Sequence, residues 1–578
     1  PWMLIMAAES LHKVAFTFSS QDARDSMSKL NFDAAKILAG NNAFVSAATC
    51  LCNAIDLLGK DSWKRCYDST LQTYNSSAEM EFYAGNHAQC EERVQNILKH
   101  AKTLDDQQTA YFIYVQSLSA VQMYDKALAT GLTVLRNMRL SRIPWRVSLL
   151  QMLIEVVTTT KILKKWSSEA LLEREKTDDP KMELYIRLLV FSSWAAWFSG
   201  RRNEFVFLSI RAVKMSLRYG YASYTSPAFA VAAMVCGSMS NFAECDRLGE
   251  TANRLVGRFP GAKDAKSITL CFYTACSYHM FNVCEPKEYL NRCLEARNVG
   301  MNGGNLASGC TNAYLRIFFG FCNSGMRLDR LIALAAEYRD EHVSLNKTSF
   351  LVCLRVVRQV AMNFAGQSGS PHILEGEEIR DSREISEAED PLNKRMFVWA
   401  MVYLSYMFDD FEKAKSYSAI SVKVWKQDFP VYGSMFAVVV RQMSWCKLYD
   451  ISGSRRYRRF AIQDLKLVQG WVESGLVNHR STYAMLQAET LALVKKKSID
   501  VVEAAYEKAV SSLEEAGYIL LAACSAERAG DFFVQKNRLE LARDYIVRSS
   551  DLYRKIRASG KVRHLMSKHP NLIPTAPE

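Results

Sequence analysis

The chain has 578 residues, of which 49% are hydrophobic and 23% are charged, and these globular proportions exclude an intrinsically disordered chain. Only 26 glycines and 12 prolines occur, so the many special turns of a sheet-rich protein are missing and long helices are favoured. The formal net charge of +13 is spread over short basic runs at residues 161–165, 455–459 and 495–497, which solvated helix faces explain.

The 15 cysteines show no CxxC spacing, and many lie in apolar helical patterns, as Cys50, Cys90 and Cys353 do. Free cysteine behaves as a small hydrophobic residue in a core. Such a set predicts a reducing compartment, and we expect a cytoplasmic protein without a signal peptide. The longest uncharged apolar stretch, residues 267–284, contains polar side chains, so we expect a buried hairpin there and no membrane span.

A helix–turn–helix unit first becomes clear at residues 71–101. Its turn is Ala84-Gly85-Asn86, and Cys90 and Val94 lie on one apolar face of the helix that follows. The next unit places its turn and second helix at residues 124–128. Ala127 follows the equivalent Cys90 by 37 residues, close to the period of about 34 residues of tetratricopeptide repeats.

The same combination of turn, aromatic residue and small residue recurs downstream. Its members are Gly200, Phe205 and Ala212; Phe242, Cys245 and Ala252; Phe411 and Ala414; Val502, Tyr506 and Ala509; and Ala526, Ala529, Gly530 and Phe533 with Ala542, Ile546 and Ser549. Small residues let paired helices approach closely, and larger ones fill the groove of the next pair. We therefore predict an all-α fold, an α-solenoid of tetratricopeptide-like helix hairpins (an α-α superhelix), and not an ordinary bundle.

Several segments interrupt this pattern. Prolines break it at residues 141–144 and 177–180, and Asp179 is predicted to cap the next helix. The longest irregular segment is acidic, and we expect it to be a partly mobile, solvated loop. The predicted organisation is two solenoid blocks at 26–365 and 395–560, the acidic loop at 366–394, and a disordered tail at 561–578.

Motifs of known catalytic sites are missing from the sequence. The P-loop signature is absent, and the glycine-rich segment 300–309 has no lysine to reach a phosphate. The kinase motifs HRD and DFG, the zinc motif HExxH and the nucleophile motif GxSxG are also absent. We therefore predict no catalytic residue, no cofactor and no metal, and the residues of a binding face are not readable from the sequence.

One group of potential metal ligands lies within residues 271–293. It comprises Cys271, Cys276, His279, Cys284 and Cys293. Zinc ligands usually come in two closely spaced pairs, and here only Cys276 and His279 have that spacing. Core cysteines of a helix hairpin are the preferred interpretation. An enzyme with an unrecognised site in this region stays open as an alternative.

A second alternative is nucleic-acid binding, because of the net positive charge. It requires a basic stripe interleaved with aromatic residues, and only RRYRRF at residues 455–460 has that pattern. A solvated helix surface explains this segment equally well. We therefore expect protein partners in preference to nucleic acid.

Four sequence blocks resemble a known family. Residues 57–86, 124–138, 207–235 and 498–562 are similar to the helical-repeat region of the predicted signal-transduction ATPases of the AAA/STAND type, many of which are multidomain sensor kinases. The resemblance covers nearly the whole chain. In this family a tetratricopeptide-like region follows an NTPase core, and residues 1–25 would then be a remnant of the segment after that core.

The resemblance implies a non-catalytic interaction and regulatory solenoid, the sensor or scaffold part of a larger signal-transduction ATPase or protein kinase. Its partners would be proteins, including its own upstream ATPase or kinase domains, and the concave face of the stack would bind them. The ATP-binding and kinase motifs of the family are absent here, so no residue inherits a role in ATP hydrolysis. Phe205 and Val502 stand at usual alanine positions, which makes the repeats degenerate.

Overall fold

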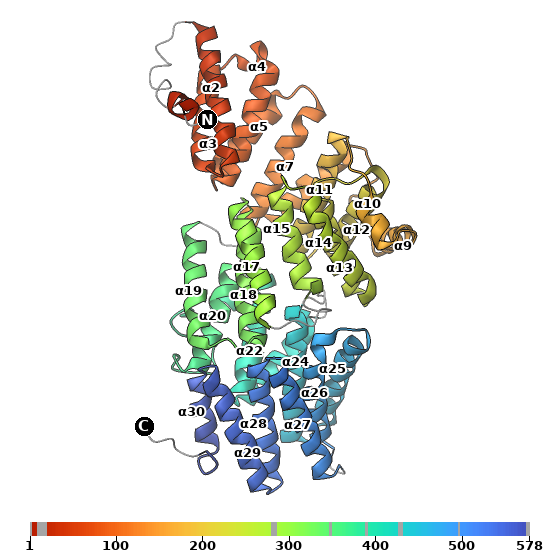
Figure 1. Ribbon diagram of the computed structural model, residues 1–578, viewed down its shortest axis with the longest axis vertical. Helices are drawn as coiled ribbons and strands as arrows, with labels where there is room; N and C mark the ends of the chain where they lie inside the picture. Colours follow the sequence, from red (N-terminus) through yellow and green to blue (C-terminus); the bar gives the residue numbers. More distant parts are fainter. Residues whose placement is uncertain are drawn as a thin grey trace. The chain divides into compact units, whose positions relative to one another are not determined.

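The computed structural model describes residues 3–8, 20–278, 286–303, 305–345, 350–387, 391–425, 432–494 and 497–573. The secondary structure of these residues is helical, with connecting turns and loops, and contains no strand apart from an isolated bridge between Lys176 and Tyr221. Successive helices pack as antiparallel neighbours along the chain (Figure 1). The predicted all-α solenoid of tetratricopeptide-like hairpins is therefore confirmed.

The helices up to residue 219 are α2 (Gln21–Gly40), α3 (Phe44–Leu58), α4 (Ser62–Arg65), α5 (Tyr67–Tyr83), α6 (His87–His100), α7 (Leu104–Ala120), α8 (Tyr124–Asn137), α9 (Leu149–Leu163), α10 (Ser168–Glu173), α11 (Pro180–Phe198) and α12 (Arg202–Tyr219). The next are α13 (Thr225–Ser238), α14 (Phe242–Leu255), η1 (Val256–Arg258), α15 (Lys263–Tyr273), the π-helix η2 (Thr274–Tyr278), α17 (Pro286–Asn302) and α18 (Leu306–Asn323).

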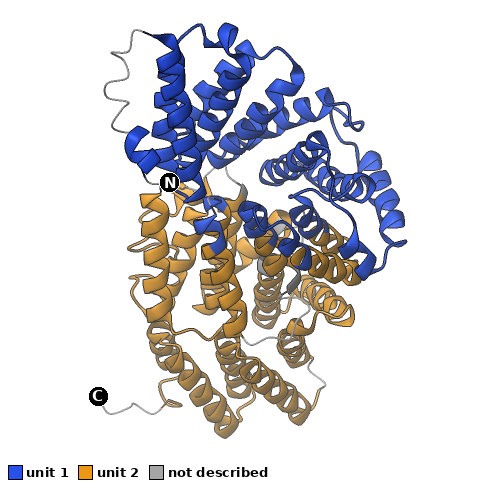
Figure 2. Ribbon diagram, turned by 45° about the horizontal axis from the view of Figure 1, so that its top comes forward, with its two compact units in different colours: residues 1–232, 254–269, 299–307 blue, residues 233–253, 270–298, 308–578 orange. Residues whose placement is uncertain are grey.

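The remaining helices are α19 (Leu328–Ser344), α20 (Leu351–Ala365), α21 (Arg383–Ser386), α22 (Pro391–Met407), α23 (Phe411–Trp425), α24 (Tyr432–Ser452), α25 (Arg455–Glu473), η3 (Val477–His479), α26 (Arg480–Ala492), α27 (Ile499–Glu515), α28 (Ile519–Gln535), α29 (Leu539–Lys555) and α30 (Ser559–Lys568). The chain divides into two compact units (Figure 2). Unit 1 comprises residues 1–232, 254–269 and 299–307, and unit 2 comprises residues 233–253, 270–298 and 308–578.

Unit 1 contains the hairpins α2–α3, α5–α6, α7–α8 and α11–α12. The predicted turn after α5 is confirmed, since Gly85 has a φ of 82°, a backbone conformation that glycine adopts without a steric penalty. Helix α8 begins at the predicted Tyr124, and Ala127 is completely buried.

Helices α9 and α10 form an insertion in this stack. Helix α11 packs directly on α8, and α9 packs on α12. The two predicted proline breaks therefore mark the ends of the insertion. At its second end Asp179 caps α11, because its Oδ1 accepts a hydrogen bond of 2.9 Å from the backbone N of Lys181, and Pro180 opens the helix.

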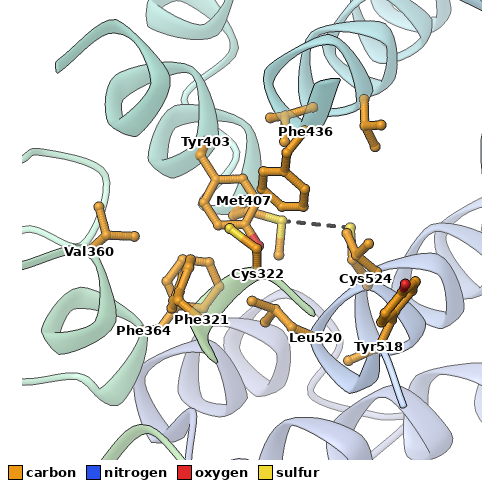
Figure 3. Packing of buried hydrophobic residues seen from close by; sticks show 14 of the residues in the cluster. Phe321, Cys322, Val360, Phe364, Tyr403, Met407, Phe436, Tyr518, Leu520 and Cys524 are labelled. Atoms are coloured by element: carbon orange, nitrogen blue, oxygen red, sulfur yellow. Dashed lines mark hydrogen bonds between the residues drawn. The ribbon is translucent and has the colours of Figure 1, made fainter. Parts of the chain in front are cut away.

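Unit 2 is built around helices that are buried on all sides. Helices α20, α22, α24 and α28 are buried along almost their whole described length. Their side chains pack together, with Phe364, Tyr403, Met407 and Cys524 in one cluster (Figure 3). A helix that is apolar all round needs such surroundings. These four helices therefore form the interior of unit 2.

Small residues mark the helix crossings, as predicted for the last hairpin. Gly530 of α28 faces α29 so closely that a Cβ atom there would lie 2.5 Å from Cγ1 and Cδ1 of Ile546. Ala526, Ala529 and Ala542 are completely buried nearby. The absence of a side chain at position 530 allows the two helices to approach.

The acidic segment differs from the solvated loop expected at residues 366–394. Leu374 and Ile379 are completely buried, and Glu378 is only 6% exposed. The carboxylate of Glu378 pairs with Arg339, and also with Nη1 of Arg358 at 2.8 Å. Two arginines on α19 and α20 therefore compensate for the burial of this carboxylate. Residues 388–390 lie outside the described part of the chain.

The tail predicted to be disordered at 561–578 instead contains most of α30, which extends to Lys568. Lys561 is only 1% exposed, and its Nζ donates to Glu527 at 2.9 Å. Lys568 pairs with Asp409 at 2.9 Å, across more than 150 residues of sequence. The cations of α30 thus compensate the buried carboxylate of Glu527 and the half-buried carboxylate of Asp409, and they tie this helix to the rest of unit 2.

We predict that replacing Gly530 with alanine lowers the free energy of unfolding by about 1–3 kcal/mol, because the new methyl group overlaps Ile546. The matched control is Gly470→Ala. Gly470 also lies inside a helix, α25, but has open space where a Cβ would be, so alanine should be neutral or stabilise by up to about 1 kcal/mol. Chemical denaturation measures both, and equal effects would contradict the crossing geometry.

Candidate binding cleft

A polar cleft of about 510 Å³ lies within unit 1. It is lined by Glu79, Tyr83, Lys176, Arg187, Ser223, Tyr224, Arg258, Phe259, Pro260, Gly261, Ala262 and Asp264. The first two residues belong to α5, Arg187 belongs to α11, and Asp264 lies at the start of α15. Several titratable groups that are distant in sequence therefore converge here, in a volume that suits a side chain or a small ligand.

Backbone contacts hold one wall of the cleft. The isolated bridge pairs the segment at Lys176 with the segment at Tyr221, through N of Thr177 to O of Tyr221 at 3.0 Å and N of Tyr221 to O of Glu175 at 2.9 Å. Gly220 adopts a φ of 102°, and a Cβ atom there would lie 2.9 Å from N of Thr177. Glycine thus allows this close approach, which places Ser223 and Tyr224 at the cleft.

Asp264 is fixed by two hydrogen bonds. Its Oδ1 accepts from the backbone N of Ala265 at 2.8 Å, and its Oδ2 accepts from the buried hydroxyl of Tyr224. Ser223 is also engaged, because its backbone N and its hydroxyl both donate to the carboxylate of Glu183. The carboxyl group of Asp264 is therefore preorganised before any ligand arrives.

The positive charge of Arg187 acts on both carboxyl groups of the cleft, Glu79 and Asp264, and opposes the rise of their pKa values. Its guanidinium lies over the rings of Phe112 and Tyr224, with its carbon 4.3 Å and 5.2 Å from the ring centroids. Its Nε is buried without a hydrogen-bond partner in the described structure. The aromatic rings therefore hold this charge by cation–π contact, and the guanidinium keeps an unused donor.

The two carboxyl groups have altered acidity. Burial raises the pKa of Glu79, which the neighbouring Asp264 raises further and Arg187 partly offsets. Burial also raises the pKa of Asp264, against the opposing charge of Arg187. Burial and the same two carboxylates raise the pKa of Tyr83. Two carboxyl groups thus share one guanidinium, which leaves this part of the cleft suited to a further cation.

The other cations of the cleft are engaged at a different wall. The guanidinium of Arg258 donates to the carbonyl oxygens of Leu172 and Arg174 at 2.9 Å and 2.6 Å. The Nζ of Lys176 lies 4.8 Å from the ring centroid of Phe259. The cleft therefore has one wall with excess carboxyl groups and another wall with hydrogen-bond donors.

Sequence reasoning did not identify this cleft. Glu79 and Asp264 are separated by 185 positions, and nothing in the sequence links them. The local signal was only a glutamate between the buried residues Ala78 and Met80 on α5. An interior carboxyl group in an apolar pattern is the feature that could have drawn attention to this position.

The predicted Cys/His group is a set of core thiols where the structure describes it. Cys271, Cys276 and Cys293 are buried. Burial raises the pKa of Cys271 to about 12 and the pKa of Cys293 to about 12, as expected for protonated core thiols. His279 and Cys284 lie outside the described residues.

A different set of potential metal ligands occurs in unit 2. Carboxylate oxygens of Asp409 and Glu527 and a ring nitrogen of His564 lie within 4.8 Å of one another. The two carboxylates already pair with the ammonium groups of Lys568 and Lys561, each at 2.9 Å. These lysines supply the positive charge that a metal ion would provide, so the group fits an internal ion-pair network.

The basic run at residues 455–460 forms the start of α25. Its four arginines are exposed, but its aromatic residues pack inward. Tyr457 stacks on the buried Trp445 with ring centroids 5.7 Å apart, and Phe460 contacts the same ring at 5.2 Å. These aromatic rings are therefore occupied by the core and not presented to bases. Of the run at 495–497, only Lys497 is described.

Comparisons with known proteins give no family for the chain. No family model matches it, and no curated protein matches it. Among solved structures, the crystal structure of the yeast Tom70 is 12% identical, with a TM-score of 0.19, over 95% of this chain and 98% of that chain. The structure of Naa15/Naa10 bound to HypK-THB is 13% identical, with a TM-score of 0.20, over 99% and 97%. Such values carry no functional argument, and the fold assignment rests on the hairpins of the chain itself.

The sequence analysis predicts no membrane-spanning helix, which requires a long and apolar segment. Among the helices that the structure describes, none combines the length and the apolar character needed to cross a bilayer.

We predict that Glu79→Gln raises the melting temperature by a few degrees at about pH 7, and that this gain fades as the pH falls to about 4. Burial raises the pKa of Glu79 in the folded protein, so its ionised form is disfavoured relative to the unfolded chain. Stability is therefore lost as the pH rises above the unfolded pKa, and glutamine removes that loss.

The control for this prediction is Glu92→Gln on α6, where the glutamate side chain is 66% exposed and burial costs it little. This variant should melt like the parent at both pH values. Thermal unfolding followed by circular dichroism measures all three proteins. A pH-independent loss of stability in Glu79→Gln would contradict the assigned cause.

Proposed function

We propose that this protein is a non-catalytic protein-interaction scaffold, in which stacked helix hairpins present a recognition cleft to a partner polypeptide. The observation that carries this proposal is the convergence of two carboxyl groups, Glu79 and Asp264, with the guanidinium of Arg187 in the cleft of unit 1. Helical-repeat proteins commonly use such preformed surfaces to bind extended or helical segments of other proteins.

The chemistry of the cleft favours a basic side chain of the partner. An ammonium or guanidinium group placed between Glu79 and Asp264 would stabilise their ionised forms and remove the cost that burial imposes on them. The Nζ of Lys176, which also lines the cleft, would donate to carbonyl oxygens of the same segment. The recognised element would therefore be a peptide segment that carries a lysine or an arginine.

An arrayed library of lysine- and arginine-containing peptides tests this function. The parent protein should bind a subset of the peptides saturably. The double variant Glu79→Gln/Asp264→Asn should lose at least about tenfold in affinity, which is about 1.4 kcal/mol, because the charge-assisted contacts are gone.

Glu92→Gln should bind like the parent in the same experiment, since its side chain is exposed on α6. Melting curves establish that the double variant remains folded. A lack of any saturable peptide, or equal binding by the parent and the double variant, would contradict the proposal.

We also propose a more specific setting, in which the scaffold is the sensor or scaffold part of a larger signal-transduction ATPase or protein kinase in the cytoplasm. The four sequence blocks that resemble the repeat region of those ATPases support it, and the buried free thiols suit a reducing compartment. The reading frame upstream of Pro1 tests this setting. It should encode a P-loop ATPase, and a frame without one would contradict the setting while leaving the scaffold function intact.

A further inference from the structure

Helix α9 has an apolar face that no described element covers. Its buried face packs on α12, where Glu155 is 4% exposed and forms an ion pair of 2.6 Å with Arg211. The opposite face presents Leu149, Leu150, Leu153, Ile154 and Val157, with Leu150 67% and Ile154 52% exposed. Their spacing places these side chains in one stripe along the helix. In Figure 1, α9 is labelled beside α12.

Trp145 extends this apolar stripe at the amino-terminal end of α9. It is 78% exposed, although the guanidinium of Arg136 lies 4.1 Å from its ring centroid. An indole ring with one polar edge is the side chain that most often lies at the boundary between water and lipid.

Basic residues flank the stripe at both ends. Arg139, Arg142 and Arg146 precede α9, and Lys161, Lys164 and Lys165 lie at its carboxyl end. All six are exposed, and none takes part in an ion pair within the described residues. The only acidic residue between positions 139 and 165 is Glu155, which faces the core. The exposed surface of the segment is therefore apolar in the middle and positive at both ends.

We propose that α9 docks on an anionic membrane surface, lying in the plane of the interface with its apolar stripe among the lipid acyl chains. The flanking arginines and lysines would contact lipid phosphates, while Trp145 would lie at headgroup level. This goes beyond the peptide-binding function proposed for the cleft, because it gives the scaffold a place at which it acts.

Two features favour a lipid surface over a protein partner. The five exposed side chains of the stripe are all aliphatic and offer no hydrogen-bonding group, and beside it Oε1 of Gln151 accepts from Ser148 while Thr158 bonds to Lys214. Protein interfaces normally contain about one hydrogen bond per 100–200 Å², which a lipid phase does not require. The cations at both ends of the helix also match the continuous negative charge of an anionic bilayer, which extends equally in both directions.

Flotation with lipid vesicles tests the proposal on the full chain. The parent should float with vesicles that contain phosphatidylserine and remain in solution with pure phosphatidylcholine. Leu150→Ser/Ile154→Ser should lose at least about tenfold in partitioning, because the inserted aliphatic groups are gone. Lys161→Gln/Lys164→Gln/Lys165→Gln should lose about a hundredfold, at about fivefold per cation, and binding should weaken as salt is added.

The matched control is Leu539→Ser, which removes another exposed leucine, on α29, and should float like the parent. Melting curves confirm that the variants are folded, as expected for exposed positions. Failure of the parent to float with anionic vesicles overturns the proposal, as does flotation that Leu150→Ser/Ile154→Ser leaves unchanged.

Two other outcomes would also overturn it. Without vesicle binding, a dimer that Leu150→Ser/Ile154→Ser dissociates would assign the stripe to a contact between copies of the chain. Capture of an acidic amphipathic peptide under the same conditions would assign it to a protein partner. Neither result would affect the cleft, which the peptide array tests separately.

Discussion

A helix that is apolar around its whole circumference is stable in water only when other helices surround it, and this constraint governs unit 2. Helices α22 and α28 have this character, and their aromatic and aliphatic side chains are buried on every side. An isolated hairpin could not bury them, so the outer helices and the carboxyl-terminal α30 are parts of one core.

Charge balance distinguishes the core of unit 2 from the cleft of unit 1. In unit 2 the buried carboxylate of Glu527 and the half-buried carboxylate of Asp409 each pair with a lysine of α30, so their charge is neutralised internally. In the cleft of unit 1, Glu79 and Asp264 share one arginine, and burial raises the pKa of both groups. A neutralised network stabilises a fold, whereas an unbalanced cleft can gain from a ligand of opposite charge. Both surfaces that we propose for recognition, the cleft and the exposed apolar face of α9, therefore lie in unit 1.

The repeat pattern predicted the hairpins well because turns and crossings are local. Gly85 and Gly530 indicate a turn and a crossing from a few neighbouring residues, and both are confirmed. The order of α30 and the burial of Glu378 could not be predicted in this way, since their partners are distant in sequence. The cleft could not be predicted for the same reason, because Tyr224 and Asp264 form their hydrogen bond only after distant parts of the chain have packed together. Neighbouring residues thus predict the helices and turns, whereas the partners of buried charged side chains are known only from the folded structure.

We propose that the hairpin stack is a binding scaffold with its recognition site at the cleft of unit 1. Hydrogen–deuterium exchange with and without a saturating basic peptide tests it most directly, because binding slows exchange where the peptide contacts the backbone or closes the cleft. The account predicts slower exchange in α5, at residues 221–224 and at residues 258–264, with no change in α28. Slower exchange confined to unit 2, or no change anywhere at saturation, would contradict it.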